Sequence, residues 1–189
     1  MTNFYFGSYC PVKETTVRWN EINTVECSIA RALSVVGDRW TMMIVRDVFL
    51  GIRRFDAMQQ DLGLTPHRLS HRLGKLVRDG ILARVEYEKR PRRFEYRLTE
   101  KGIDLFPLIV VLNTWGDRWM AGRAGAPIEL VHRNCGRAIK TALTCPSCDE
   151  KIVPREMSLR PGPALKHRGL PGRTFQPVQV PAHFAHYRG

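Results

Sequence analysis

The chain has 189 residues, 43% of them apolar, which is enough to bury a hydrophobic core in one domain with a smaller appendage. Its 30 Lys and Arg against 18 Asp and Glu leave a formal net charge of +12, which favours a polyanionic partner such as nucleic acid. The longest strongly apolar stretch, Leu105 to Leu112, is too short to span a bilayer, so the sequence argues against a membrane-spanning protein.

The amino-terminal segment does not resemble an export signal. Met1 to Cys10 holds no basic region followed by an apolar core, so we expect a cytoplasmic protein whose residues 1–26 form an extension. Five cysteines are an odd number, and without export a disulfide framework is not expected. Metal binding or thiol chemistry is the better interpretation of these cysteines.

Three helices are predicted before residue 64. Ile29, Leu33 and Val36 recur at helical spacing from Ser28 until Gly37 ends the pattern. Asp38 or Thr41 can cap a second, strongly apolar helix that ends at Gly51, and a third should run over residues 54–62 before Gly63.

The fourth predicted helix is the most informative. Thr65 is a good N-cap and Pro66 suits the first helical position, so the helix should begin there and end near Asp79. At 100° per residue its apolar positions form one stripe, expected to pack on the core, comprising Leu69, Leu73, Leu76 and Val77. The remaining faces are rich in cations and imidazoles, which suits a DNA major groove.

Individual roles can be assigned along this helix. The residues expected to lie at its base-facing end are Pro66, His67, Arg68 and His71. Thr65, the N-cap, is also counted among the DNA-binding residues. Those expected to position the helix or contact phosphate are Ser70, Arg72 and Lys75. The alternative is that a basic helix face is simply solvated, as charged faces usually are.

A β-hairpin follows, and its tip is basic. Ala83, Val85 and Tyr87 alternate with charged residues, and a similar alternation resumes at Phe94 after a five-residue loop. That loop reads Lys89, Arg90, Pro91, Arg92, Arg93. The window from Thr65 to Arg93 holds nine Lys and Arg and three acidic residues, a net +6 and half of the total charge, which favours DNA binding over a solvated face.

Thr99 is expected to cap a final helix that reaches about Met120 and is bent or interrupted at Pro107. Between Leu105 and Leu112 this helix is apolar on every side, so we expect it to pack on a second copy of the chain, together with the helix over residues 28–36. Burial under the carboxyl-terminal part of the same chain is the alternative. Trp40, Phe106 and Trp115 could line an effector pocket or belong to the core.

These residues resemble the HxlR-type winged helix-turn-helix regulators of bacteria. The resemblance rests on Cys27, thirteen residues before the Trp of Gly37-Asp38-Arg39-Trp40-Thr41, on Ile44-Val45-Arg46-Asp47, Arg53-Arg54-Phe55, Leu69-Ser70-His71-Arg72-Leu73 and Asp79-Gly80-Ile81, and on the run from Arg93 to Gly102. It covers about residues 27–121 and implies a homodimeric repressor or activator that binds inverted-repeat operators and dimerises through its terminal helices.

The resemblance also implies a candidate sensor. In some members of the family the thiol at the position of Cys27 senses oxidants or electrophiles, and Arg31, one turn along, could stabilise a thiolate. Here Ser28 follows the thiol where the family usually has Pro, so an inert or buried cysteine is the alternative.

Beyond this region, a spacing of H-x2-C-x9-C-x2-C offers four N and S ligands, namely His132, Cys135, Cys145 and Cys148. Such a set matches a closed structural Zn²⁺ site in a zinc-ribbon-like module over residues 128–153. A redox dithiol at Cys145 and Cys148 is the alternative. Residues 158–189, rich in Pro and Gly, are expected to be a flexible basic tail.

Together these features predict a mainly α protein with a small β-hairpin wing and a zinc-ribbon-like module. We expect a homodimeric, sequence-specific transcription regulator, a repressor, that binds double-stranded DNA and responds to a small molecule or to thiol oxidation. No catalytic residues are predicted. The rival interpretations are a non-specific basic nucleic-acid-binding zinc protein and a thiol enzyme that uses Cys145 and Cys148.

Overall fold

The computed structural model describes residues 19–24, 27–139, 141–153 and 156–157. The chain divides into two compact units, one ending at Met120 and the other beginning at Ala121. The predicted tail over residues 158–189 and most of the extension over residues 1–26 lie outside the described residues. No helix in the described part of the chain is long and apolar enough to cross a membrane.

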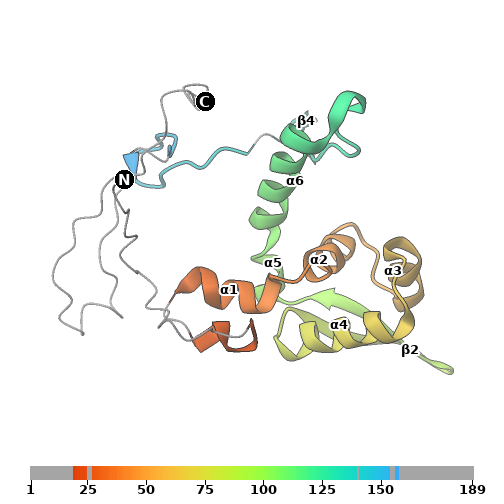
Figure 1. Ribbon diagram of the computed structural model, residues 1–189. Helices are drawn as coiled ribbons and strands as arrows, with labels where there is room; N and C mark the ends of the chain where they lie inside the picture. Colours follow the sequence, from red (N-terminus) through yellow and green to blue (C-terminus); the bar gives the residue numbers. More distant parts are fainter. Residues whose placement is uncertain (1–18, 25–26, 140, 154–155, 158–189) are drawn as a thin grey trace. The chain divides into compact units, whose positions relative to one another are not determined.

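The first unit is mostly helical, with one antiparallel hairpin (Figure 1). Its elements are the 3-10 helix η1 (Trp19–Thr24), the helices α1 (Ser28–Val36), α2 (Thr41–Phe49), α3 (Phe55–Leu62) and α4 (Pro66–Arg78), the strands β1 (Leu82–Lys89) and β2 (Arg92–Leu98), and the helices α5 (Glu100–Ile103) and α6 (Phe106–Met120). The second unit holds the 3-10 helix η2 (Gly122–Ala124) and the short strands β3 (Val131–His132) and β4 (Arg137–Ala138).

The helix boundaries follow the local signals. Thr65 caps α4 by accepting a hydrogen bond from the Arg68 amide (3.4 Å), and Pro66 occupies the first helical position as predicted. At the far end of α3, Gly63 has φ +61°, a left-handed conformation that costs a residue without Cβ little. The α3–turn–α4 segment is therefore a helix-turn-helix.

The core lies where α2, α3 and α4 pack against the hairpin. It is built from ten buried apolar residues, namely Ile44, Val45, Val48, Met58, Leu64, Leu69, Leu73, Leu76, Ile81 and Leu82. The predicted stripe of α4 is thus confirmed at three of its four positions. The fourth, Val77, is 36% exposed, and its prediction as a core residue was wrong, because it lies about 80° around the helix from Leu69, at the edge of the stripe.

The hairpin is longer than predicted. β1 and β2 pair from Leu82 opposite Leu98 up to Lys89 opposite Arg92, so the five-residue loop is wrong and Arg90 and Pro91 alone form the tip. An irregularity between Glu86 and Glu88 accommodates an extra residue in β1. The segment before α3 also joins this sheet, because the Tyr96 amide donates to the Arg53 carbonyl oxygen (2.8 Å).

The predicted final helix is interrupted, at Asp104 and Leu105, where α5 ends and α6 begins. The break lies just before Pro107, whose ring nitrogen cannot donate the next helical hydrogen bond. Thr99 caps α5 by accepting from the Gly102 amide (3.1 Å), as expected. Val110 is the one buried apolar residue of α6, whereas its other apolar side chains are at most half-buried.

The start of α5 is fastened to the residues that follow α4. The Thr99 hydroxyl donates to the Gly80 carbonyl oxygen (2.6 Å), and the Thr99 amide donates to that of Ile81 (3.1 Å). The Lys101 ammonium donates to the carbonyl oxygen of Asp79 (2.8 Å). These three bonds anchor the carboxyl end of α4.

Candidate nucleic-acid interface

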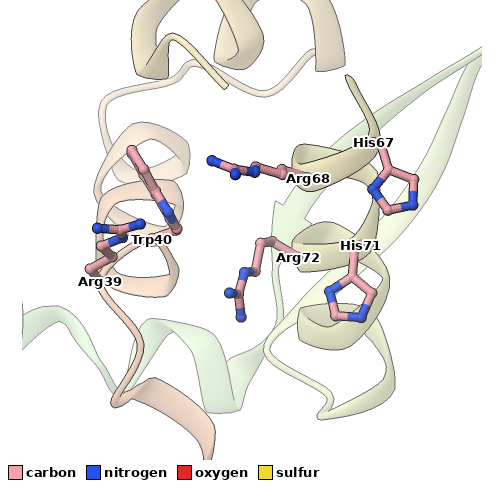
Figure 2. A pocket seen from close by; sticks show the side chains of 6 residues that line it. All are labelled: Arg39, Trp40, His67, Arg68, His71 and Arg72. Atoms are coloured by element: carbon pink, nitrogen blue, oxygen red, sulfur yellow. The ribbon is translucent and has the colours of Figure 1, made fainter. Parts of the chain in front are cut away.

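The amino end of α4 is exposed. Among the residues at the base-facing end, His67, Arg68 and His71 are exposed, and no described residue pairs with their side chains by a hydrogen bond or an ion pair. The apolar stripe fixes this arrangement, because it holds the opposite side of the helix against the core. Figure 2 shows His67 and His71 on one side of α4 and Arg68 and Arg72 on another.

Arg68 and Arg72 point across a pocket of about 480 Å³ toward the residues that precede α2 (Figure 2). Arg39 and Trp40 line its other side, and the Arg39 guanidinium lies 5.3 Å from the Trp40 ring centroid. Three guanidinium groups around one hollow on a solvent-facing surface create a positive potential that suits an oxyanion such as a phosphate. Arg39 was not among the predicted DNA-binding residues, because only the placement of the start of α2 beside α4 brings it to this pocket.

Asp38 connects α2 with α4. Its carboxylate accepts hydrogen bonds from the amides of Trp40 (3.0 Å) and Thr41 (3.2 Å) and from the Thr41 hydroxyl, and it pairs with Arg72 at 3.3 Å. Partial burial opposes ionisation of Asp38, but these hydrogen bonds and the Arg72 charge outweigh it and lower its pKa. Asp38 therefore satisfies amides at the start of α2 by accepting their hydrogen bonds, although the N-cap position itself is Trp40 and not Asp38 or Thr41 as predicted. It also orients Arg72 of α4.

Lys75 has partners inside the protein. Its ammonium donates to the carbonyl oxygen of Ser34 in α1 (3.2 Å) and pairs with Asp79 at 2.5 Å. The prediction that Lys75 contacts phosphate is therefore not supported by its position. The Lys75 side chain instead links α4 to α1, through a contact between residues 41 positions apart in the sequence.

The hairpin carries its cations at the tip and in the strand residues next to it. Lys89 and Arg90 are exposed. Arg92 pairs with Glu86 (2.7 Å) and Arg93 with Glu88 (3.4 Å), yet their side chains remain 72% and 56% exposed. Such exposed pairs contribute little to stability, so these guanidinium groups stay available to an external phosphate.

The three aromatic residues considered for an effector pocket lie in different settings. Trp40 packs against the core and lines the pocket beside α4. The Phe106 ring packs at a tilt against Phe49, with 5.3 Å between centroids, and Trp115 in α6 is 51% exposed. Cys27 is half-buried at the N-cap of α1. An effector, and oxidant sensing by Cys27, stay predictions.

The four candidate metal ligands lie in two turns of the second unit. In the first turn His132 Nδ1 lies 3.4 Å from Cys135 Sγ. In the second turn the pKa of Cys145 is lowered, chiefly because the amides of Ser147 and Cys148 donate to its sulfur. Within the described ranges, no three His, Cys, Asp or Glu side chains gather around one point, so the structure does not bring the four together.

An exposed basic helix in a helix-turn-helix, followed by a basic hairpin, defines a winged helix-turn-helix protein of the DNA-binding class. Comparison with known proteins agrees, because residues 35–124 match the model of the HxlR-like helix-turn-helix family. The chain is 46% identical over 139 residues to the uncharacterized HTH-type transcriptional regulator Rv3095 of Mycobacterium tuberculosis, a match that covers 74% of this chain and 88% of the relative. The chain belongs to the HxlR-like helix-turn-helix family. Because its relatives are transcriptional regulators, membership implies a DNA-binding and non-enzymatic role.

Solved structures give the same fold. PA1607, provisionally described as a transcription factor, aligns with a TM-score of 0.67 and 34% identity, covering 72% of this chain and 96% of that chain. PA1374 of Pseudomonas aeruginosa, described in the same way, aligns with a TM-score of 0.53 and 34% identity, covering 73% of this chain and 94% of that chain. The match to Rv3095 spans 139 residues, whereas the family region ends at residue 124. The similarity to this relative therefore extends into residues beyond the family region.

Proposed function

We propose that the protein is a homodimeric, sequence-specific transcriptional repressor that inserts the amino end of α4 into the major groove of its operator. The observation that carries this proposal is the exposed surface of His67, Arg68 and His71, whose side chains have no hydrogen-bond or ion-pair partner among the described residues. Polar side chains at the amino end of a recognition helix are those that reach base edges. His67 and His71, opposite the apolar stripe, are assigned to base contacts.

The pocket beside α4 is assigned to the DNA backbone. Arg39, Arg68 and Arg72 face it, and Asp38 holds Arg72 in place at 3.3 Å. One phosphate seated there would fix the register of α4 in the groove, because backbone contacts position a protein while base contacts give specificity. This assignment moves Arg68 from base reading, which the sequence favoured, to phosphate binding. The cations at the hairpin tip would hold the flanking backbone.

A second copy of the chain is the proposed partner of α6. Seven apolar residues of this helix are between 38% and 71% exposed, namely Phe106, Leu108, Val111, Leu112, Trp115, Trp119 and Met120. In α1, Ile29 is 71% exposed. A soluble monomer rarely leaves so large an apolar surface in water, and aromatic residues are enriched at interfaces between proteins. Two-fold pairing would present two recognition helices to half-sites about 34–36 Å apart, one turn of DNA.

Repression is the simplest outcome of such a complex, because a dimer bound over a promoter blocks access to it. The contact between Lys75 and the Ser34 carbonyl oxygen supports a response to an effector or to oxidation. A ligand or a modified thiol that displaces α1, which begins after Cys27, would also strain the placement of α4.

Binding of the purified full chain to its own upstream DNA and to an unrelated duplex, at two salt concentrations, tests the proposal. We expect a preference of about 10³-fold or more for the cognate duplex. Equal affinity for both duplexes would favour the rival interpretation, a non-specific basic nucleic-acid-binding protein, whose affinity falls with salt and ignores sequence.

Variants separate the roles of the side chains. His71→Ala should reduce discrimination at one base pair by about 1 kcal/mol, or roughly fivefold. Arg68→Ala should weaken all duplexes alike and reduce the salt slope by about one, and the double variant Arg92→Ala with Arg93→Ala should reduce it by about two. Arg78→Ala is the matched control, since Arg78 lies at the other end of α4, and it should leave discrimination unchanged. If Arg68→Ala alters preference at one position, the phosphate assignment is wrong.

A further inference from the structure

The described part of the second unit has no hydrophobic core. None of residues 121–139 and 141–153 is buried, and apolar side chains such as Ile128, Val131 and Leu143 are half or more exposed, at about 50%, 49% and 65%. Backbone hydrogen bonds alone do not hold so small a fold together, and units of this size usually rely on a metal or on disulfides. The order of its turns therefore requires another source of stability.

The first turn has the shape of a metal-binding knuckle. β3 and β4 pair as an antiparallel hairpin around it, with His132 opposite Arg137. The amides of Cys135 (3.2 Å) and Gly136 (2.8 Å) both donate to the His132 carbonyl oxygen, and Gly136 has φ +68°. This tight turn places the side chains of His132 and Cys135 on the same side, with 3.4 Å between Nδ1 and Sγ.

The second turn, residues 145–149, has a similar backbone arrangement to the first turn, residues 132–136. The two sequences share only the cysteine at the fourth position, Cys135 in the first and Cys148 in the second. The Asp149 amide donates to the Cys145 carbonyl oxygen (2.9 Å), the Cys145 amide donates to that of Glu150 (2.8 Å), and Thr144 bridges Lys151. Asp149 has φ +57°, and it is the one residue other than glycine with a positive φ in the described part of the chain. It follows Cys148 as Gly136 follows Cys135.

The distance in the first turn fits tetrahedral coordination. With zinc bonds of about 2.0 Å to nitrogen and about 2.3 Å to sulfur at a tetrahedral angle, two adjacent ligand atoms are separated by about 3.5 Å. The observed 3.4 Å between His132 Nδ1 and Cys135 Sγ agrees with that separation. The two atoms are therefore already arranged as one edge of a tetrahedron.

We propose that one zinc ion binds to His132 Nδ1 and to the thiolates of Cys135, Cys145 and Cys148, and that it draws the two turns together into a zinc ribbon. The nine residues between Cys135 and Cys145 form a short connection, whose closure costs little entropy. Three thiolates and Zn²⁺ carry a net charge of −1. The residues flanking the ligands add the cations Arg133, Arg137 and Lys151 and the carboxylates Asp149 and Glu150, a net +1 that offsets it. The ion has all four positions filled by protein, so its role is structural and not catalytic.

The proposal does not depend on DNA binding, and its test uses metal content and spectra. The full chain, purified without chelator, should contain about one zinc per chain by elemental analysis. After exchange with Co²⁺ it should give the visible bands of tetrahedral cobalt and a near-ultraviolet band from thiolate to cobalt. Cys135→Ser and Cys148→Ser should each lose the metal and both spectral features.

Two further variants keep the test decisive. His132→Cys should retain one metal per chain and strengthen the thiolate band by about one third, because four thiolates replace three. Cys27→Ser, a matched loss of one thiol from the first unit, should leave metal content and spectrum unchanged. Zinc below about half an equivalent, with Cys145 and Cys148 cycling between dithiol and disulfide, would overturn the proposal in favour of the redox dithiol. An unchanged cobalt spectrum in Cys135→Ser would also overturn it.

Discussion

Replacement of Asp38 by Ala should destabilise the first unit more than any other single change of a surface carboxylate. The Asp38 carboxylate accepts three hydrogen bonds at the start of α2 and pairs with Arg72. The Thr41 hydroxyl that donates to it belongs to a residue only 1% exposed. Asp38→Ala removes the cap, leaves this buried hydroxyl without its acceptor, and releases Arg72.

The magnitude follows from these contacts. Loss of an N-cap costs about 1 kcal/mol, and a buried hydroxyl deprived of its partner costs about 1–3 kcal/mol. The partly exposed pair with Arg72 adds less than about 1 kcal/mol. The free energy of unfolding should therefore fall by about 2–5 kcal/mol at pH 7, which lowers the melting temperature of a domain of this size by roughly 10–25 °C.

The effect should depend on pH. Because the folded protein lowers the pKa of Asp38 below its usual 3.8, the charged carboxylate stabilises the fold fully above that value. This stabilisation is lost as the pH falls through the lowered pKa of the folded state. The difference in stability between the parent protein and Asp38→Ala should thus be constant near neutral pH and narrow below about pH 4.

Urea unfolding followed by circular dichroism, at one fixed protein concentration because a dimer couples stability to concentration, measures these quantities. Asp38→Asn keeps one acceptor oxygen for the amides of Trp40 and Thr41 but loses the charge, so it should lose less stability than Asp38→Ala. It should weaken DNA binding, because Arg72 is no longer held by a charge. Asp56→Ala, which removes an exposed carboxylate from the first turn of α3, is the control and should cost less than about 1 kcal/mol. A loss below about 1 kcal/mol for Asp38→Ala would refute this account of the cap.

Two more predictions concern packing and assembly. Gly102→Ala should lower the free energy of unfolding by about 1–3 kcal/mol or more, because its Cβ would lie 2.3 Å from the Ile81 carbonyl oxygen. Gly74→Ala should instead raise it by up to about 1 kcal/mol, since its Cβ meets only the end of a flexible side chain. Thermal unfolding of the two variants compares these effects. Trp115→Glu should weaken the proposed dimer by about 2 kcal/mol or more, roughly 30-fold in the Kd measured by sedimentation equilibrium. The control Leu143→Glu, at an exposed position of the second unit, should leave that Kd unchanged. A parent protein that sediments as a monomer would contradict the proposed dimer.

The sequence predicts most of what short-range chemistry controls. Thr65, Pro66 and Gly63 set the boundaries of the recognition helix through capping and backbone conformation, and these act over a few residues. The stripe of Leu69, Leu73 and Leu76 follows from helical periodicity alone. These local signals were sufficient to place α3 and α4 and to predict the side of α4 that faces outward, whereas the helix-turn-helix itself was implied by the family resemblance.

Features that depend on distant parts of the chain were not predictable in this way. The destination of Lys75 depends on how α1 packs, and its partner Ser34 lies 41 residues away. The pocket that joins Arg39 to Arg68 requires the relative placement of two helices, which periodicity does not encode. The hairpin tip appeared to be a loop because its five residues are charged or Pro, whereas cross-strand pairing at Lys89 and Arg92 extends the ladder through them.

Beyond the packing of Leu69, Leu73 and Leu76 on the core, α4 is also held by hydrogen bonds at its carboxyl end. Its 13 residues span about 20 Å, with three hydrogen bonds to Thr99 and Lys101 at the carboxyl end and the side chains proposed to read DNA at the other. A tilt of about 5° at the anchor displaces the reading end by about 1.7 Å, several times the tolerance of a hydrogen bond to a base. In the proposed complex, the accuracy of operator recognition would therefore depend on hydrogen bonds at the carboxyl end of α4, far from the DNA. Loss of these bonds should reduce that accuracy while leaving the total charge and every contacting residue unchanged.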